Sequence, residues 1–400
     1  MTSATDPLNH TTKYHYDAAG RMDKVTDPAN GVNSQDFDAI GRPTKLVDAL
    51  NRVTTLTYDD TIQAGSHLVT IKNAESGITV EQFDAEGNLV SVTDPRGVVT
   101  RYEYDGLNRL TSVTEAVGVS GLERSTNYQY DAVGNLSSFT DALQRTTLFD
   151  YDEPNRKVTI TNPLNQVSVE QFDAAGQLQS KTDHRGTITK YGYDKVGQLL
   201  QQIEAYGQPE QRSNSTAYDL FGNVTSSIDV RGTRTDFVID DFNRVKSVTE
   251  AANVTALKRT TNYTYDSADH LLTVADPYGT VSKFGYDLLG HVTQTIDADN
   301  VPTLKRTTTQ QYDPVGNVTR VTDPYGTQTS ITYDKLDRAA EVIEAFNVAA
   351  LRRTTSYKYD EDNNVVRITD AAGTQTSFVY DELNRRTKQT DAANTCPDAS

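Results

Sequence analysis

The chain has 400 residues, of which 36% are hydrophobic, and it contains 22 Tyr and 11 Phe but no Trp. This hydrophobic fraction lies below the roughly 45–50% of packed globular proteins, which excludes several thick cores. The formal net charge of −17 opposes binding to nucleic acid or anionic lipid, because both carry negative phosphates. No run of 18 apolar residues is present, so we expect no membrane insertion by this segment. The single cysteine, Cys396, excludes a disulfide within the chain.

An aromatic residue followed by aspartate recurs along the chain. A Tyr-Asp or Phe-Asp pair stands at 16 regularly spaced places from Tyr16 to Tyr380, and Ile239-Asp240 fills one further place, which gives 17 copies. Successive copies are 21 residues apart in ten cases and 25 or 26 apart in six. Such a period is typical of repeat proteins, in which each repeat packs on its neighbours.

Each repeat carries two turn signals. In the repeat that begins at Phe83, Asp84-x-x-Gly87 and Asp94-Pro-x-Gly97 both place Asp first and Gly fourth. Type I turns favour these residues, with Pro second. The residues between the turns are rich in Val, Thr, Tyr and Leu, which favour strands. The sequence therefore predicts an all-β fold of tandem antiparallel β-hairpins.

The two strands of a repeat differ in regularity. After the second turn, Thr329, Ile331 and Tyr333 alternate and face one side of the sheet. After the first turn, Val318 and Val321 are three apart, so a regular strand would place them on opposite faces. Either this strand contains a β-bulge or both of its faces are partly covered.

The longer repeats extend the second turn, in segments that begin at Glu115, Glu204, Glu250, Asp297 and Glu344. In residues 59–65 the insertion falls in the first turn instead. No Pro/Ser-rich linker or charge block interrupts the array. We therefore expect one continuous array over residues 1–395, of about 17 repeats without an internal domain boundary, and a short tail at 396–400. No signal peptide is visible at the start of the chain.

The pattern Tyr-Asp-x-x-Gly-Arg/Asn-Leu/Val, Thr-Asp-Pro-x-Gly and Thr-x-Tyr-x-Tyr-Asp resembles the YD repeat of Rhs-family proteins. That family includes Rhs polymorphic toxins, the shell components of insecticidal Tc toxins, and teneurins. The resemblance covers residues 5–394 and implies a curved, spiralling β-sheet strip that is part of a hollow shell. In the toxin members the shell encloses an effector domain, whereas in the adhesive members it presents a surface to glycans or receptors.

The repeated aspartates could have one of two roles. They could form a carboxylate array for a metal ion or a sugar, or each could accept backbone N–H bonds within its own turn. Turn chemistry favours the second. Asp360-x-Asp362-x-Asn364 begins like a calcium loop, but Val365 and Ala371 stand where such a loop needs Gly and Glu.

Other catalytic signals are weak. The six histidines lack metal-site spacing, and His270 and His291 stand where other repeats carry Arg or Asn. Cys396 has no local His partner. No nucleophile elbow or phosphate-binding loop is present. We therefore predict no metal, no cofactor and no enzymatic activity.

The repeated tyrosines could also have one of two roles. They could form sugar-stacking platforms, or they could stack as a ladder that stabilises neighbouring hairpins. The ladder is favoured, because a single-layer sheet offers few other apolar contacts. The predicted structural positions are Tyr16, Asp17, Tyr104, Asp105, Tyr130, Asp131, Tyr193, Asp194, Tyr218, Asp219, Tyr265, Asp266, Tyr312, Asp313, Tyr359 and Asp360.

Two functions follow from this interpretation. The first is a non-catalytic segment of an Rhs/YD-repeat shell that encapsulates a toxin or effector domain, with that domain and further shell segments as partners. The alternative is an extracellular carbohydrate-binding or cell-surface adhesion module, with glycans or a receptor as partners. Both place the mature system outside the cell or on its surface.

Overall fold

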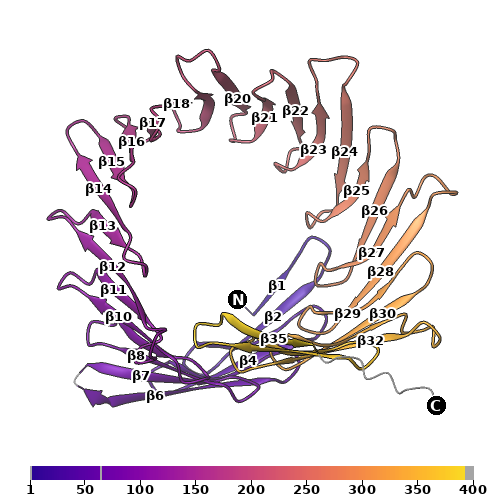
Figure 1. Cartoon of the computed structure of the whole chain (residues 1–400). Coiled ribbons are helices and arrows are strands. Elements are labelled where there is room, and N and C mark those ends of the chain that lie inside the picture. Colours follow the sequence, from indigo (N-terminus) through magenta and orange to yellow (C-terminus); the bar gives the residue numbers. More distant parts are fainter. Residues whose placement is uncertain (1, 64, 392–400) are drawn as a thin grey trace, which may run out of the picture. The chain divides into compact units, whose positions relative to one another are not determined.

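The computed structural model describes residues 2–63 and 65–391, so the predicted tail with Cys396 lies outside the described residues. The described residues form 35 β-strands and no helix, and all 35 strands belong to one antiparallel sheet (Figure 1). No described segment forms a helix of the length and hydropathy needed to cross a membrane. The predicted all-β fold of antiparallel hairpins is confirmed.

The strands fall into two compact units, and unit 1 contains two stretches of chain, residues 2–125 and 283–391, with the short segment 267–270. Its first stretch contains β1 (Ser3–Thr5), β2 (Thr11–Tyr16), β3 (Met22–Thr26), β4 (Val32–Phe37), β5 (Pro43–Val47), β6 (Val53–Gln63), β7 (Ser66–Lys72), β8 (Ile78–Phe83), β9 (Leu89–Thr93), β10 (Val99–Tyr104) and β11 (Leu110–Glu115). Its second stretch contains β27 (Val292–Asp297), β28 (Arg306–Tyr312), β29 (Val318–Thr322), β30 (Gln328–Tyr333), β31 (Ala339–Glu344), β32 (Arg353–Tyr359), β33 (Val365–Thr369), β34 (Gln375–Tyr380) and β35 (Arg386–Asp391).

Unit 2 contains residues 126–266 and 271–282, and strands β12 (Arg124–Tyr130) and β26 (Val281–Tyr286) straddle its limits. Its other strands are β13 (Leu136–Thr140), β14 (Thr146–Asp152), β15 (Lys157–Thr161), β16 (Val167–Phe172), β17 (Leu178–Thr182), β18 (Ile188–Tyr193), β19 (Leu199–Glu204), β20 (Arg212–Tyr218), β21 (Val224–Ile228), β22 (Arg234–Ile239), β23 (Val245–Glu250), β24 (Arg259–Tyr265) and β25 (Leu271–Ala275). The prediction of a single array without a domain boundary stays a prediction.

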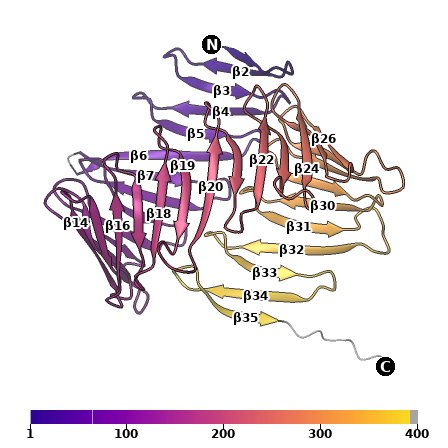
Figure 2. The ribbon, with the colours of Figure 1, turned by 90° about the horizontal axis from the view of Figure 1, so that it is seen from above.

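Within each unit the strands pair antiparallel in chain order, as β2 with β3 and β3 with β4 in unit 1, and β20 with β21 and β21 with β22 in unit 2. Figure 2 shows this order for β2 to β5 and for β31 to β35. As a result, the aromatic-Asp turns of a unit lie along one edge of its sheet, and the Asp-Pro-x-Gly turns lie along the other. We call these the first-turn edge and the second-turn edge.

The first turns are type I turns closed by a residue with positive φ. In the turn after β20, the N–H of Gly222 donates to the carbonyl of Asp219 (3.2 Å), and the N–H of Asp219 donates to the carbonyl of Asn223 (2.9 Å). Gly222 has a φ of 89°, which an L-residue adopts only with strain. Asn108 takes the same role in another first turn, with a φ of 58°. A type I turn followed by a residue in the left-handed conformation is a common three-residue connection of β-hairpins.

The irregular strand contains a β-bulge. Gln311 lies opposite Arg320 and Tyr312 lies opposite Val318, so Thr319 is an extra residue on its strand. Its hydroxyl donates to the carbonyl of Gln311 (3.2 Å). The bulge, one of the two alternatives that the sequence left open, therefore explains the spacing of Val318 and Val321. Equivalent hydroxyl bonds are made by Thr111, Thr225, Thr293 and Thr387.

The sheet is a single layer with a very small core. The solvent-accessible area is 24566 Å², against about 15,500 Å² expected for a compact monomer of this mass. Among the described residues, Val69 is one of few buried apolar side chains, with 8% of its surface exposed. Stability therefore depends on contacts between neighbouring strands and between turns.

Alanines at the start of the long second turns make up most of this core. Ala116, which is 1% exposed, has a φ of 51°, and four equivalent alanines are also buried with positive φ. The residue that follows each of four of these alanines bonds back to the preceding hairpin, as the N–H of Phe346 does to the carbonyl of Gln328 (2.7 Å). The four equivalent alanines are Ala205, Ala251, Ala298 and Ala345, the last of which precedes Phe346. Four of the five long second-turn hairpins are thus anchored at their base by a backbone bond of this kind, and the buried alanine is common to all five.

Candidate functional site

The repeated aspartates organise the first turns. One oxygen of Asp219 accepts the N–H groups of Phe221 and Asn223 (both 2.9 Å), and the other accepts the amide of the Asn223 side chain (2.9 Å). These are the bonds of an Asx-turn. The same backbone bonds are made by Asp17, Asp105, Asp131, Asp194, Asp313 and Asp360.

Two aspartates of the repeat lie in turns of another shape. Asp59 lies in the long β6–β7 hairpin and accepts the N–H of Thr61 (2.9 Å). Asp152 closes a wider turn and accepts the side-chain amide of Asn155. Where the inserted or widened turn replaces the tight loop, the carboxylate binds donors within that turn. At Asp266, as at Asp360, the backbone carbonyl accepts a hydrogen bond from the arginine of the preceding first turn, which is Arg244 (2.8 Å) for Asp266 and Arg338 (3.1 Å) for Asp360.

The turn bonds stabilise the ionised carboxylates. The side chain of Arg109 holds the pKa of Asp105 below its ordinary value, and that of Asn223 does the same for the pKa of Asp219. For Asp17 the main cause of the lowered pKa is the backbone N–H of Arg21. Hydrogen bonds to the charged form favour it over the protonated form.

The tyrosine hydroxyls tie each hairpin to the one before it. The hydroxyl of Tyr359, at the end of β32, donates to the carbonyl of Ala339 (2.9 Å) on the neighbouring strand β31, which belongs to the preceding first-turn hairpin. The same bond is made by Tyr58, Tyr104, Tyr151, Tyr193, Tyr218, Tyr265, Tyr312, Tyr333 and Tyr380. Burial raises the pKa of Tyr104, Tyr193, Tyr265, Tyr312 and Tyr359. Of the other predicted positions, Tyr16 pairs with Met22 across the sheet and Tyr130 pairs with Leu136.

The rings of the repeat pack against cationic or imidazole side chains. The guanidinium carbon of Arg338 lies 4.5 Å from the ring centre of Tyr359. Arg338 also binds the Asp334 carboxylate (2.7 Å) and the carbonyl of Asp360 (3.1 Å), so one side chain joins two turns. Arg21 over Phe37 and Arg244 over Tyr265 repeat this arrangement, and His270 and His291 stack on Tyr286 and Tyr312.

Sequence reasoning missed this arginine position. The ladder was expected from tyrosine rings stacking on one another, whereas the contacts found here place the residue that follows the first turn over the next aromatic ring. The signal was present in the repeat, because Arg, Asn or His recurs at that position. His270 and His291, which replace Arg or Asn at this position, also pack on the next aromatic ring.

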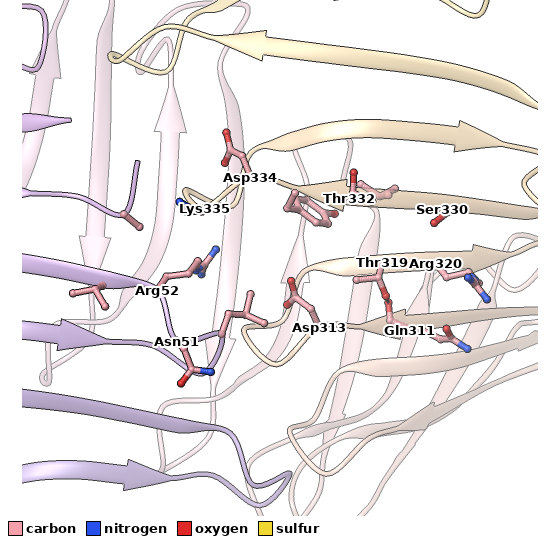
Figure 3. A pocket seen from close by; sticks show the side chains of 15 residues that line it. Asn51, Arg52, Gln311, Asp313, Thr319, Arg320, Ser330, Thr332, Asp334 and Lys335 are labelled. Atoms are coloured by element: carbon pink, nitrogen blue, oxygen red, sulfur yellow. Dashed lines mark hydrogen bonds between the residues drawn. The ribbon is translucent and has the colours of Figure 1, made fainter. Parts of the chain in front are cut away.

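In unit 1, the second turns of the first stretch meet the first turns of the second stretch. Figure 3 shows the turn with Asn51 and Arg52 facing the turn with Asp334 and Lys335. Arg52 donates to both oxygens of Asp337 (2.7 and 3.0 Å), and it also binds its own turn residue Asp48 (2.5 Å). The Arg52 guanidinium holds the pKa of Asp337 below its ordinary value. We call this row of contacts the seam.

Two further contacts extend the seam. Glu75 accepts the backbone N–H of Lys335 (3.0 Å). Arg96, from the turn after β9, binds the Asp362 carboxylate (2.5 Å), the carbonyl of Asp381 (3.2 Å) and the Asn384 side chain (2.7 Å). Asp362, which the sequence had placed in a failed calcium motif, is therefore an ion-pair partner of Arg96.

A cavity of about 750 Å³ opens at the seam, lined from one side by Leu50 and Arg52 and from the other by Asp313, Arg320 and Tyr333. Of its charged groups, Arg52 is held in an ion pair and Asp313 in a turn cap. The guanidinium of Arg320 lies over the ring of Phe346, and among the described residues its Nε has no hydrogen-bond partner. No group of three or more His, Cys, Asp or Glu side chains in the described part of the chain is arranged to hold a metal ion. The contacts at the seam brace one stretch of sheet against another.

The fold and these contacts define a repeat protein whose recurring residues join hairpins to one another. A family model described as RHS Repeat matches residues 1–32, 83–120 and 350–395, and a model described as Teneurin YD-shell matches residues 103–326. The second match covers more than half of the chain, and the chain belongs to the teneurin YD-shell family. A comparison with curated proteins found no match.

Solved structures are similar to the chain in fold. A crystal structure of TcdB2-TccC3-TEV has 14% sequence identity and a TM-score of 0.63, and the match covers 94% of this chain and 24% of that one. A crystal structure of TcdB2-TccC3 has 14% identity and a TM-score of 0.62 over 98% of this chain and 30% of that one. A structure of the Photorhabdus luminescens Tc holotoxin pore has 13% identity and a TM-score of 0.63 over 94% and 24%. The chain spans less than a third of the length of these structures.

Proposed function

We propose that this chain is a non-catalytic wall segment of a YD-repeat shell, and that the shell encloses a toxin or effector domain outside the cell or on its surface. Family membership and the fold shared with Tc toxin chains support a structural role. The seam carries the proposal further, because it joins turns that are 285 residues apart, as between Arg52 and Asp337. A container needs such joints, since a single-layer sheet has no interior of its own.

The recurring side chains support a structural role over a catalytic one. The carboxylates of Asp17, Asp105 and Asp219 accept hydrogen bonds within their turns. The hydroxyls of Tyr104 and Tyr359 are bound to carbonyls. Residues occupied in this way hold the sheet together and do not converge on a substrate.

Protease protection tests the enclosure. The chain would be expressed together with its neighbouring genes, purified through a tag on this chain, and treated with increasing amounts of protease. We expect a co-purified effector to resist protease until the shell itself is cut. In a double variant, Arg52→Asp with Arg96→Asp, the effector should be cleaved at a protease concentration at least tenfold lower. An effector digested at the same rate with an intact shell, an opened seam or no shell would contradict the proposal.

A further inference from the structure

The first-turn edge of unit 2 carries a row of uncovered apolar side chains. Val196, Phe221 and Phe242 occupy the third position of three successive first turns, and they are 81%, 83% and 75% exposed. In the second stretch of unit 1, the same position is filled by Val315, Leu336 and Leu383, which are half-buried. In its first stretch, whose first turns are not part of the seam, Ile40 and Leu107 are 75% and 72% exposed at that position. The turns of Leu336 and Leu383 are those on which the seam is built. The third position is therefore covered where a second-turn edge lies against it and bare where none does.

The second-turn edge of unit 2 is equally bare. Leu143 and Leu164 are 72% and 76% exposed at the third position of two short second turns, and Arg185 is exposed at that position of the next. In the first stretch of unit 1, two of the corresponding residues face the seam. Leu50 lines the seam cavity and Arg96 binds Asp362. Unit 2 thus carries counterparts of both halves of a seam, and the named residues of both halves are exposed.

We propose that these two edges bind each other between copies of this chain. The row Val196, Phe221 and Phe242 of one copy receives the row Leu143, Leu164 and Arg185 of another. The seam of unit 1 is the template, since it already joins three successive short second turns to first turns of this same sequence. It also fixes the order, because turns 48–52 and 94–98 meet turns 334–338 and 381–385 in ascending sequence.

The two rows match in spacing and chemistry. Neighbouring turns on either edge are two strands apart, about 9.6 Å, so the rows stay in register over three turns. In the order of the template, Leu143 meets Val196, Leu164 meets Phe221, and Arg185 meets Phe242. The first two contacts bury apolar surface. The third places a guanidinium beside an aromatic ring, with the exposed Asp241 next to it.

This interface is heterologous, since one edge binds a different edge, and such interfaces build head-to-tail chains. Sedimentation velocity of the whole protein at 1 to 100 µM tests it. We expect association of the unmodified protein that rises with concentration. Val196→Asp with Phe221→Asp blocks one edge, and Leu143→Asp with Leu164→Asp blocks the other, so each double variant alone should associate at least tenfold more weakly. An equimolar mixture of the two should form a 1:1 dimer that grows no further.

The matched control is Val238→Thr, in β22, which is 51% exposed but lies within a strand. It should associate as the unmodified protein does. The four Asp substitutions stand in exposed turns, and unchanged far-ultraviolet circular dichroism would verify folding. A monomeric unmodified protein at 100 µM, a mixture that stays monomeric, or edge variants that associate normally would each overturn the proposal. This test needs no effector, so its outcome is separate from that of the proposed function.

Discussion

The guanidinium of Arg52 donates two hydrogen bonds, of 2.7 and 3.0 Å, to the carboxylate of Asp337, a residue 285 positions further along the chain. Away from the seam, each hairpin is joined to its sequence neighbours, as expected of a repeat array. The pair therefore links two stretches of sheet that the repeat alone would leave independent. A planar guanidinium suits this role because it binds both carboxylate oxygens at once.

Breaking the Arg52–Asp337 pair should lower the free energy of unfolding by the interaction energy between the two side chains. In a double-mutant cycle with Arg52→Ala and Asp337→Asn, we expect a coupling energy of about 1 kcal/mol, since Asp337 is partly exposed to water. Urea unfolding followed by circular dichroism measures it. The same cycle on Arg145 and Asp141, an exposed pair within one turn, should give a clearly smaller coupling energy. Equal coupling in both cycles would remove any special role for the seam pair.

The tyrosine hydroxyls should contribute to stability where they bind carbonyls. Tyr265→Phe removes the 2.9 Å bond to the carbonyl of Val245 and should destabilise the protein by about 1 kcal/mol. Tyr278→Phe is the matched control, because Tyr278 is 81% exposed in a turn. Its free energy of unfolding should be unchanged. A Tyr265→Phe variant as stable as the control would show that the ring alone stabilises the hairpin.

The turn aspartates should be replaceable by asparagine and not by alanine. Asp323 accepts the N–H groups of Tyr325 and Thr327 (both 2.8 Å). Asn73 makes the equivalent bonds in another second turn, which shows that an amide oxygen is sufficient. Asp323→Ala should cost about 1–2 kcal/mol, whereas Asp323→Asn should cost less than about 0.5 kcal/mol. Chemical denaturation measures both, and a large loss in the Asn variant would mean that the charge itself is required.

High pH should weaken the ladder. Burial raises the pKa of Tyr104, Tyr193, Tyr265 and Tyr359 in the folded protein, so above the ordinary tyrosine value the folded state holds more protons than the unfolded chain. Stability is then fully present below pH 10 and falls as the pH rises through the raised pKa values. Denaturation at pH 9 to 11 measures this slope. Tyr265→Phe with Tyr359→Phe should make the slope shallower, and an unchanged slope would assign the loss to other groups.

The local structure could be predicted from the sequence because it is encoded within each repeat. Asp219 and Gly222 specify a turn by their own chemistry, and the recurrence of such pairs fixes the hairpins. The bulge was one of two alternatives, since the spacing of Val318 and Val321 does not reveal that Thr319 can bond a carbonyl across the strand. That bond depends on pairing with the neighbouring hairpin.

The joints between distant hairpins could not be predicted in the same way. Arg96 and Asp362 each fit a repeat position, and nothing in a period of 21 or 25–26 residues indicates that turns 266 residues apart meet. The curvature and twist that bring them together are sums of small rotations at every strand pair. The residues around Asp362 match only the start of a calcium loop, and their spacing does not indicate that Arg96 is its partner.

Cross-linking across the seam tests most directly whether distant hairpins of this sheet meet turn to turn. In a Cys396→Ser background, which has no other cysteine, Glu75→Cys and Lys335→Cys would be treated with a bismaleimide that spans about 10 Å, roughly two strand spacings. We predict intramolecular cross-linking of nearly all molecules at low protein concentration. The comparison pair, Tyr325→Cys with Lys335→Cys, stands at opposite ends of β30, about 20 Å apart, and should not react. Cross-linking of the comparison pair alone, or of neither pair, would contradict the joined hairpins on which this account depends.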